Sequence, residues 1–390
     1  MTVRVDTLSN GFRVATERMP GLASASIGVW VDAGTRHETA SQNGIAHFLE
    51  HMAFKGTSRR TALQIAEEIE DVGGYLNAYT SRERTAYYAR VLGQDVPLAL
   101  DIIGDILRDP ALAENEIETE RGVILQEIGQ SRDTPDDIIF DWLQETAFPD
   151  QPMGRAILGP PECVRAFGRD DLSAFIGSHY HPGRMILAAA GDVDHDDLVR
   201  RAGDIFGDMP GGGTNGVDKA AYTGGEHRVE KDLEQAHFAL ALQGPGYRDD
   251  DYFSAQIAAI ALGGGMASRL FQEAREKRGL CYSIFAQNAA WAETGVMMIY
   301  AGTGGEEIGD LVDLTASELA RASEDISEYE IARARAQTKA GMVMGLESPS
   351  SRAERMAATL SIWGRVIPLE ETVARIDAVN VDSVRRILKR

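Results

Sequence analysis

A glycine-rich segment near the midpoint of the 390-residue chain places the strongest constraint on the fold. Residues 210–216 read PGGGTNG and interrupt periodic segments on both sides, as a linker does. The order of elements expected at 27–80, a strand, two helices and a strand, returns at 237–285. Such self-similarity at half the chain length indicates a duplicated α/β unit. We therefore predict an N-terminal domain at 1–210, a linker at 211–217 and a homologous C-terminal domain at 218–390.

Hydrophobic periodicity and turn signals give the expected elements. Strands are predicted at 26–31, 75–80, 85–91, 185–190, 237–242 and 280–285. Helices are predicted at 43–54, 61–72, 97–107, 115–130, 136–146, 170–180, 196–206, 252–262, 268–277, 328–346 and 349–366.

The first of these helices carries the most informative motif, which lies within residues 44–56. His47 and His51 are four residues apart, so on a helix they share one face, and Glu50 borders that face. Two imidazoles that can reach one metal, beside a carboxylate, form the core of a zinc hydrolase. The order His-x-x-Glu-His is the inverse of the commoner zinc motif. The corresponding positions of the second half are apolar, so that half keeps the scaffold without the motif.

Two histidines leave a catalytic zinc one protein ligand short. On the helix expected at 115–130, Glu120 and Glu127 are seven residues apart and therefore share a face. Val123 and Ile124 lie between them, which suggests that this face is buried, and a buried carboxylate must be paired or bind a metal. In a chain with 60 acidic residues, solvated helix glutamates are an equally simple interpretation. Spacing alone leaves both open.

Charge and composition narrow the function class. The formal net charge of −21 argues against a nucleic-acid partner and suits a cationic substrate, or simply a soluble acidic surface. Cys163 and Cys281 are too few for a disulfide framework. The N-terminus lacks the apolar region of a signal peptide, and no apolar run is long enough for a membrane span. We therefore expect a cytoplasmic protein.

Four segments together resemble the pitrilysin/insulinase superfamily of zinc peptidases, most of all the mitochondrial processing peptidase β-subunit branch and its bacterial relatives. They are residues 44–56, 73–83, 120–127 and 263–282, and the resemblance runs in order over essentially the whole chain. It implies an α+β fold of two homologous domains, each a mainly antiparallel sheet packed against helices. It also implies that the domains close like a clamshell over an acidic cavity.

The same resemblance implies the roles of the motif residues. His47, His51 and Glu127 would hold one zinc ion per chain, and Glu50 would be the general base. Glu120 would support the site from behind the ligands.

Two residues of the second half gain a role only through the resemblance. Taken alone, Arg275 belongs to a solvated run of charges, and Tyr282 is a core residue of an apolar strand. The resemblance implies that they face the zinc across the cleft, hold the substrate backbone and stabilise the tetrahedral oxyanion.

Substrate contacts are implied in two further places. Asn77 and Ala78 would lie on an edge strand to which an extended peptide adds as another strand. Asp137 and Asp141 are most simply acids at a helix N-terminus, but the resemblance implies that they hold an arginine near the cut. The expected substrates are therefore basic, presequence-like peptides.

Three functions remain to be weighed. The first is a zinc endopeptidase acting as a homodimer; the others are a non-catalytic scaffold subunit of the same fold and a catalytic subunit that needs a separate glycine-loop partner. The intact metal and Arg/Tyr motifs favour the first. His179 and His181 could form a second metal site but are expected to be structural. Residues 263–265, three glycines, lack the Gly-Lys-Ser/Thr sequence of a phosphate loop and are expected to be a packing or hinge loop.

Overall fold

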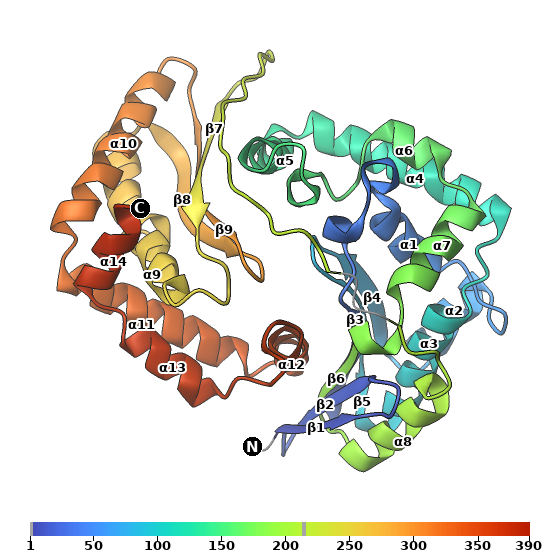
Figure 1. The fold of residues 1–390 in the computed structure, drawn as a ribbon. Coiled ribbons are helices and arrows are strands. Elements are labelled where there is room, and N and C mark those ends of the chain that lie inside the picture. Colours follow the sequence, from blue (N-terminus) through green and yellow to red (C-terminus); the bar gives the residue numbers. More distant parts are fainter. Residues whose placement is uncertain (1–2, 213–215) are drawn as a thin grey trace. The chain divides into compact units, whose positions relative to one another are not determined.

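The computed structural model describes residues 3–212 and 216–390, and Figure 1 labels its elements. The strands are β1 (Val3–Thr7), β2 (Arg13–Arg18), β3 (Ser24–Val31), β4 (Tyr75–Thr80), β5 (Thr85–Leu92), β6 (Met185–Gly191), β7 (Ala236–Gly244), β8 (Cys281–Ala290) and β9 (Gly295–Thr303). The helices are α1 (Ile45–Ala53), α2 (Ala62–Glu70), α3 (Val96–Arg108), α4 (Glu114–Asp133), α5 (Pro135–Ala147), α6 (Pro161–Ala166), α7 (Arg169–His179), α8 (His195–Phe206), α9 (Tyr252–Gly263), α10 (Ile308–Asp325), α11 (Glu328–Gly345), α12 (Pro349–Trp363), α13 (Leu369–Asp377) and α14 (Val381–Leu388).

The chain forms two compact units, and each contains segments from both halves of the sequence. Unit 1 comprises Met1–Gln130, Arg155–Asp218 and Gly345–Ile367. Unit 2 comprises Ser131–Gly154, Lys219–Met344 and Pro368–Arg390. The division predicted at the glycine-rich linker places α5 in the N-terminal domain and α12 in the C-terminal domain. In the structure α5 belongs to unit 2 and α12 belongs to unit 1.

Unit 1 is built on a six-stranded sheet in the order β1-β2-β6-β3-β5-β4, in which only β2 and β6 pair in parallel. Side chains of β3 alternate between two cores, so that Val29 faces the larger core with α1 and α3, and Trp30 faces α12. Gly28 makes room for the indole, since a Cβ there would lie 2.9 Å from the Trp30 ring. The sheet is therefore covered on both faces.

Helix α12 explains why unit 1 needs the distant segment 345–367. Met356 and Leu360 pack on the sheet face that carries Trp30. Glu354 accepts hydrogen bonds from Trp30 Nε1 at 2.8 Å and from the Tyr79 hydroxyl at 2.7 Å. A chain ending at residue 210 would leave this face of the sheet without its cover.

Unit 2 contains the smaller three-stranded antiparallel sheet β7-β9-β8. Helix α9 packs on β8, and α5 packs on β7. Phe140 of α5 packs against aromatic residues of the sheet, with its ring centroid 5.3 Å from that of Tyr300 and 6.3 Å from that of Phe285. The antiparallel sheets and covering helices confirm the predicted α+β class.

Most of the expected elements are present, with ends shifted by a few residues. The helix predicted at 268–277 differs in type from the expectation, since Phe271–Lys277 form a π-helix. Residues 213–215 of the expected linker lie outside the described residues, and 216–233 contain no helix or strand. Within 3–212 and 216–390, no helix combines the length and apolarity needed to cross a membrane.

Candidate metal centre and active site

Helix α1 owes its position to an apolar face and to a buried cap. Phe48 and Met52 pack in the large core of unit 1. At the N-terminal end, Glu38 is buried, and its carboxylate accepts from the backbone N–H groups of Gly44 and Ala46, both at 2.9 Å. Burial raises the pKa of Glu38 to about 7, against the opposing effect of these donors. The cap and the core together fix the direction in which the remaining face of α1 presents its polar side chains.

That polar face meets α4 at a cluster of three possible metal ligands. His47 Nε2 lies 3.7 Å from Glu127 Oε2, and His51 Nε2 lies 3.6 Å from the same oxygen. The two imidazole rings are 4.6 Å apart between centroids. Among the described residues, this is the group of His, Cys, Asp and Glu side chains that could hold a metal ion, with ligand atoms all within 4.8 Å of one another.

The donor set and spacing suit zinc. Tetrahedral zinc with bonds of about 2.0–2.1 Å separates its nitrogen and oxygen ligands by roughly 3.4 Å. The two nitrogen–oxygen distances of 3.6 and 3.7 Å are close to that value and too long for hydrogen bonds. Burial and the neighbouring His51 lower the pKa of His47 to about 4, which favours the neutral imidazole that a metal requires.

Glu120 lies behind this cluster and is 4% exposed. Its Oε2 lies 2.9 Å from His51 Nδ1, and its Oε1 lies 2.6 Å from Lys55 Nζ. The expectation of a buried face is correct for Glu120 and for Ile124, but wrong for Val123, which is 37% exposed. At about 100° per residue, Val123 projects roughly 60° to one side of Glu120 and Ile124 roughly 40° to the other, so Val123 lies at the solvent-facing edge of the buried stripe.

Glu50 borders the two histidines, as the motif predicts, and is held by a residue of β4. The Thr80 hydroxyl donates a 2.6 Å hydrogen bond to Glu50 Oε2. Burial raises the pKa of Glu50, while the Thr80 hydrogen bond opposes the rise. A carboxylate with a raised pKa is a stronger base than an exposed one.

Asn77 and Ala78 lie on β4, which is an edge strand of the six-stranded sheet. The hairpin bond from Ser81 N to Arg84 O fixes the alternation of the β4–β5 ladder. Residues of β4 whose backbone groups bond to β5 alternate with residues whose groups point the other way. Because Ser81 bonds to Arg84, the backbone N–H and C=O groups of Thr80, Ala78 and Leu76 point to the open edge of the sheet. In agreement, the Ala78 N–H is bonded to the Asn77 side chain at 2.9 Å.

Arg275 and Tyr282 belong to unit 2, and each coincides with a local irregularity. Arg275 lies in the π-helical segment, and its guanidinium carbon is 5.1 Å from the centroid of the Tyr282 ring. The pairing of β8 with β9 shifts register between Cys281 and Ser283, so Tyr282 is the extra residue of a bulge. The default expectation that Tyr282 is a core residue is wrong, since its side chain is 77% exposed. Bulges and π-turns commonly redirect side chains at functional sites.

Asp137 and Asp141 lie on α5, which begins with Pro135 and belongs to unit 2. Asp137 is exposed in the first turn of the helix, and Asp141 is half-buried. The metal ligands and these acids therefore lie in different units, and their use by one substrate stays a prediction.

The other groups considered from the sequence have structural surroundings. The His179 ring lies tilted against that of Phe175, with 4.4 Å between centroids, and its Nδ1 contacts Arg184. Gly263 packs against the backbone of Ala286, where a Cβ would lie 2.4 Å from its nitrogen. These contacts agree with the expected structural and packing roles.

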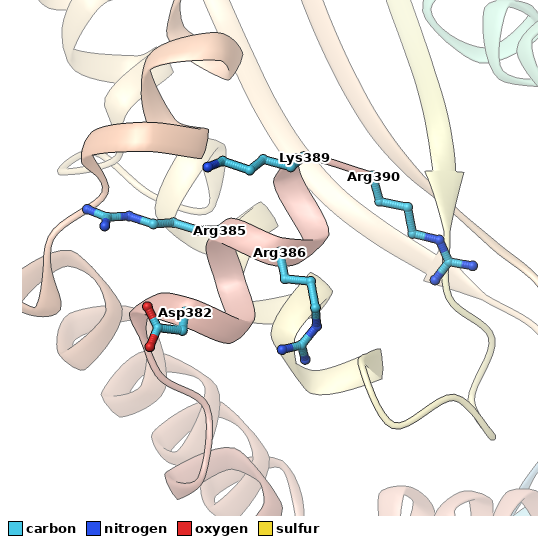
Figure 2. A pocket seen from close by; sticks show the side chains of 5 residues that line it. All are labelled: Asp382, Arg385, Arg386, Lys389 and Arg390. Atoms are coloured by element: carbon cyan, nitrogen blue, oxygen red, sulfur yellow. The ribbon is translucent and has the colours of Figure 1, made fainter.

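A hollow of about 550 Å³ lies on α14 in unit 2 (Figure 2). Asp382 and the basic residues Arg385, Arg386, Lys389 and Arg390 line it. Arg386 pairs with Asp251, and Arg390 with Asp249 at 3.7 Å. These ion pairs join the C-terminal segment, α14 and Arg390, to the residues just before α9, and the lining residues are not part of the three-residue group that could hold a metal.

Sequence reasoning missed three residues that hold the site. Glu38 caps α1, Lys55 contacts Glu120, and Thr80 contacts Glu50. Lys55 and Thr80 both lie inside segments that the motif search singled out, so proximity to the motif was an available signal. Glu38 gave no such signal, because it lies outside those segments and its partners are the backbone amides of Gly44 and Ala46 and the side-chain amide of Asn43.

Comparisons with known proteins agree with this arrangement. A family model for insulinase (peptidase family M16) matches residues 13–161, and one for the peptidase M16 inactive domain matches residues 166–338. An uncharacterized zinc protease of Rickettsia felis is 39% identical over 97% of this chain and 92% of its own length. A probable mitochondrial-processing peptidase subunit beta of Arabidopsis thaliana is 40% identical over 98% of this chain and 75% of its own length.

Solved structures show the same fold at low sequence identity. A protease from Helicobacter pylori superposes with a TM-score of 0.90 at 22% identity, covering 100% of this chain and 96% of that one. A peptidase M16 inactive domain from Pseudomonas fluorescens superposes with a TM-score of 0.89 at 19% identity, covering 100% and 94%. With relatives near 40% identity over almost the whole length, the chain belongs to the insulinase family of zinc peptidases, peptidase family M16.

Proposed function

We propose that this protein is a zinc endopeptidase that cleaves extended peptides, with His47, His51 and Glu127 as the metal ligands and Glu50 as the general base. The observation that carries the proposal is the convergence of three ligand atoms within 4.8 Å from two helices that are far apart in sequence. Relatives such as the Rickettsia felis protein are named zinc proteases, which supports the choice of metal.

A zinc ion in this cluster would acidify a bound water and polarise the substrate carbonyl. Glu50 accepts the proton of the attacking water and later delivers it to the leaving amine. The hydrogen bond from Thr80 orients the Glu50 carboxylate for both steps. Partial burial keeps bulk water away and supports the raised pKa that proton transfer near neutral pH requires.

The open edge of β4 is the proposed binding site for the peptide backbone. A peptide that pairs with Leu76, Ala78 and Thr80 adds one strand to the sheet, whatever its side chains. Thr80 connects the two parts of the site, because its backbone lies at the open edge and its hydroxyl contacts Glu50. Asn77, which bonds the Ala78 N–H, is proposed to contact the same peptide.

Arg275 and Tyr282 are proposed to complete the catalyst from unit 2. The guanidinium supplies N–H donors and the phenol supplies an O–H donor, which are the groups that stabilise a developing oxyanion. The proposal is supported by the contact between partly buried Arg275 and exposed Tyr282, which a π-helical turn and a bulge bring together. In this proposal neither unit is active alone.

For the substrate, we propose basic, presequence-like peptides, with Asp137 and Asp141 binding an arginine near the cut. The net charge of −21 adds long-range attraction for such peptides. Replacing both aspartates with Asn should lower kcat/KM for a peptide with Arg two residues before the cut, and leave a matched peptide with Ala there unchanged. Equal effects on both peptides would contradict this part of the proposal.

We also propose that the chain acts without a second kind of subunit, as a homodimer. Support comes from the presence of the metal cluster and the Arg275–Tyr282 pair in a single chain. Sedimentation of purified protein, with activity measured across the same peak, tests this. Activity that appears only after a different subunit is added would refute it.

The central test is Glu50→Gln. This variant should keep one zinc per chain, measured by metal analysis, and lose peptide cleavage, measured by mass spectrometry of a basic amphipathic peptide. Glu67→Gln is the matched control, since Glu67 is exposed on α2. Near-normal turnover in a zinc-loaded Glu50→Gln protein would overturn the assignment.

A further inference from the structure

Lys55 lies two residues after Ala53, the last residue of α1, and four residues after His51. Its backbone N–H bonds to Met52 O at 3.1 Å, and Gly56 follows with a φ of 108°, a conformation that glycine adopts without strain. The turn therefore holds the Lys55 backbone in one place. From there the ammonium group reaches Glu120 Oε1 at 2.6 Å.

Glu120 is held at both of its oxygens. Oε1 contacts Lys55 Nζ, and Oε2 contacts His51 Nδ1 at 2.9 Å. Because a carboxylate only accepts hydrogen bonds, His51 Nδ1 carries the hydrogen, and the lone pair of Nε2 faces the cluster with Glu127. Two contacts fix the plane of the carboxylate, whereas one would leave it free to rotate about that contact.

The two histidines of the cluster differ in whether a hydrogen bond to Nδ1 orients the ring. His47 Nδ1 is buried and has no hydrogen-bond partner among the described residues, so no hydrogen bond to this nitrogen orients the ring. His51 is the one of the pair whose ring is oriented by a carboxylate. Its orientation depends on Glu120, and the orientation of Glu120 depends on Lys55.

We propose that Lys55 is a positioning residue of the metal centre, which orders Glu120 and through it aligns His51 for the metal. The inference rests on the proposed function in that it takes His51 as a ligand. Lys55 itself is not a ligand: an ammonium group has no lone pair, and it contacts Oε1 of Glu120, whereas His51 contacts Oε2.

The test is zinc affinity, measured on the full-length chain by competition with a chromophoric chelator. Lys55→Met should weaken zinc binding by about tenfold or more, the usual effect of removing a group that orients a ligand. Lys55→Arg should restore most of the affinity. Lys339→Met is the matched control, since Lys339 makes an ion pair of the same kind, with Asp377 at 2.5 Å, within unit 2.

A double-mutant cycle shows whether Lys55 acts through Glu120. In a Glu120→Gln background, Lys55→Met should change zinc affinity by less than twofold. Wild-type affinity in Lys55→Met, or a full tenfold loss in both backgrounds, would overturn the proposal. Should Lys55→Met fail to fold, as judged by circular dichroism of the zinc-free protein, Lys55→Gln takes its place in the cycle.

His51→Ala separates this inference from the function on which it rests. If His51→Ala abolishes zinc binding and Lys55→Met leaves it intact, only the role of Lys55 fails. If His51→Ala binds zinc as the wild type does, the assignment of the metal centre itself fails.

Discussion

Helices α1 and α9 occupy corresponding places in the repeated order of elements, but α1 carries polar residues at positions where α9 carries apolar ones. Each follows a strand in its own unit, and each packs on a later strand, α1 on β4 and α9 on β8. Where α1 has His47, Glu50 and His51, the approximate repeat places apolar residues of α9. These are Ile257, Ile260 and Ala261, of which Ile257 is fully buried.

The difference lies in what covers each helix. In unit 2, α13 and α14 pack on α9, and their side chains Ile376 and Val384 join Ile257 in one apolar cluster. In unit 1, the equivalent face of α1 meets the carboxylates of α4. A duplicated scaffold can thus hold a metal centre or a closed core, and the residues on one helix face decide which.

The largest effect that separates the two helices should come from His51→Ala. Loss of one ligand removes the metal, so peptide cleavage should fall by about 10³-fold or more, the activation that a metal commonly supplies. Peptide hydrolysis with metal analysis of the same sample measures this. Chelator treatment of the wild type should give the same loss, and zinc should restore activity in the wild type only.

Ile257→Ala tests the other helix. A fully buried isoleucine leaves a cavity, and the free energy of unfolding should fall by about 3 kcal/mol. In the zinc-free protein His47→Ala should cost less than about 1 kcal/mol, since it removes a buried nitrogen without a hydrogen-bond partner among the described residues. Urea unfolding measures both. The comparison fails if Ile257→Ala lowers zinc content or if His47→Ala is the more destabilising change.

Arg275→Ala tests whether unit 2 contributes chemistry as well as packing. Removal of one donor to an oxyanion lowers kcat by about 10²-fold, and zinc content should stay at one per chain. Arg278→Ala, from the same run of charges, is the control. A change in KM alone would assign Arg275 to substrate binding and remove it from the chemical step.

The smallest expected effect is a pH dependence confined to unit 2. Burial would raise the pKa of Glu330, but hydrogen bonds from Arg269 and Ser327 lower it to about 2. The ion pair with Arg269 therefore stabilises the folded state fully above the unfolded pKa, about 4.5, and this stabilisation is lost as the pH falls toward 2. Glu330→Gln should cost about 1 kcal/mol at pH 6 and progressively less below pH 4.5. A constant difference across this range would contradict the expectation.

Much of the fold could be predicted because local signals agreed with the tertiary structure. The turn residues and periodic apolar positions located β4, α1 and α4 to within a few residues. The approach failed at Tyr282, where an apolar segment predicts a regular strand, but a bulge turns the side chain outward. The bulge forms where β8 pairs with β9, and the pattern of residues within β8 alone does not predict this pairing.

The spacing of residues along the chain is enough to predict the chemistry of the motif helix. Two histidines at a spacing of four can share a metal on any helix, because the spacing equals about one turn. Tertiary structure alone decided what stands around them: Glu38 at the start of α1, Lys55 on Glu120, Thr80 on Glu50, and α12 behind the sheet. Apart from Glu38, which is six and eight residues from the amides that it caps, these contacts join residues far apart in the chain, and such pairs form only when the elements pack. Periodicity is a property of neighbours in sequence, whereas a site depends on neighbours in space.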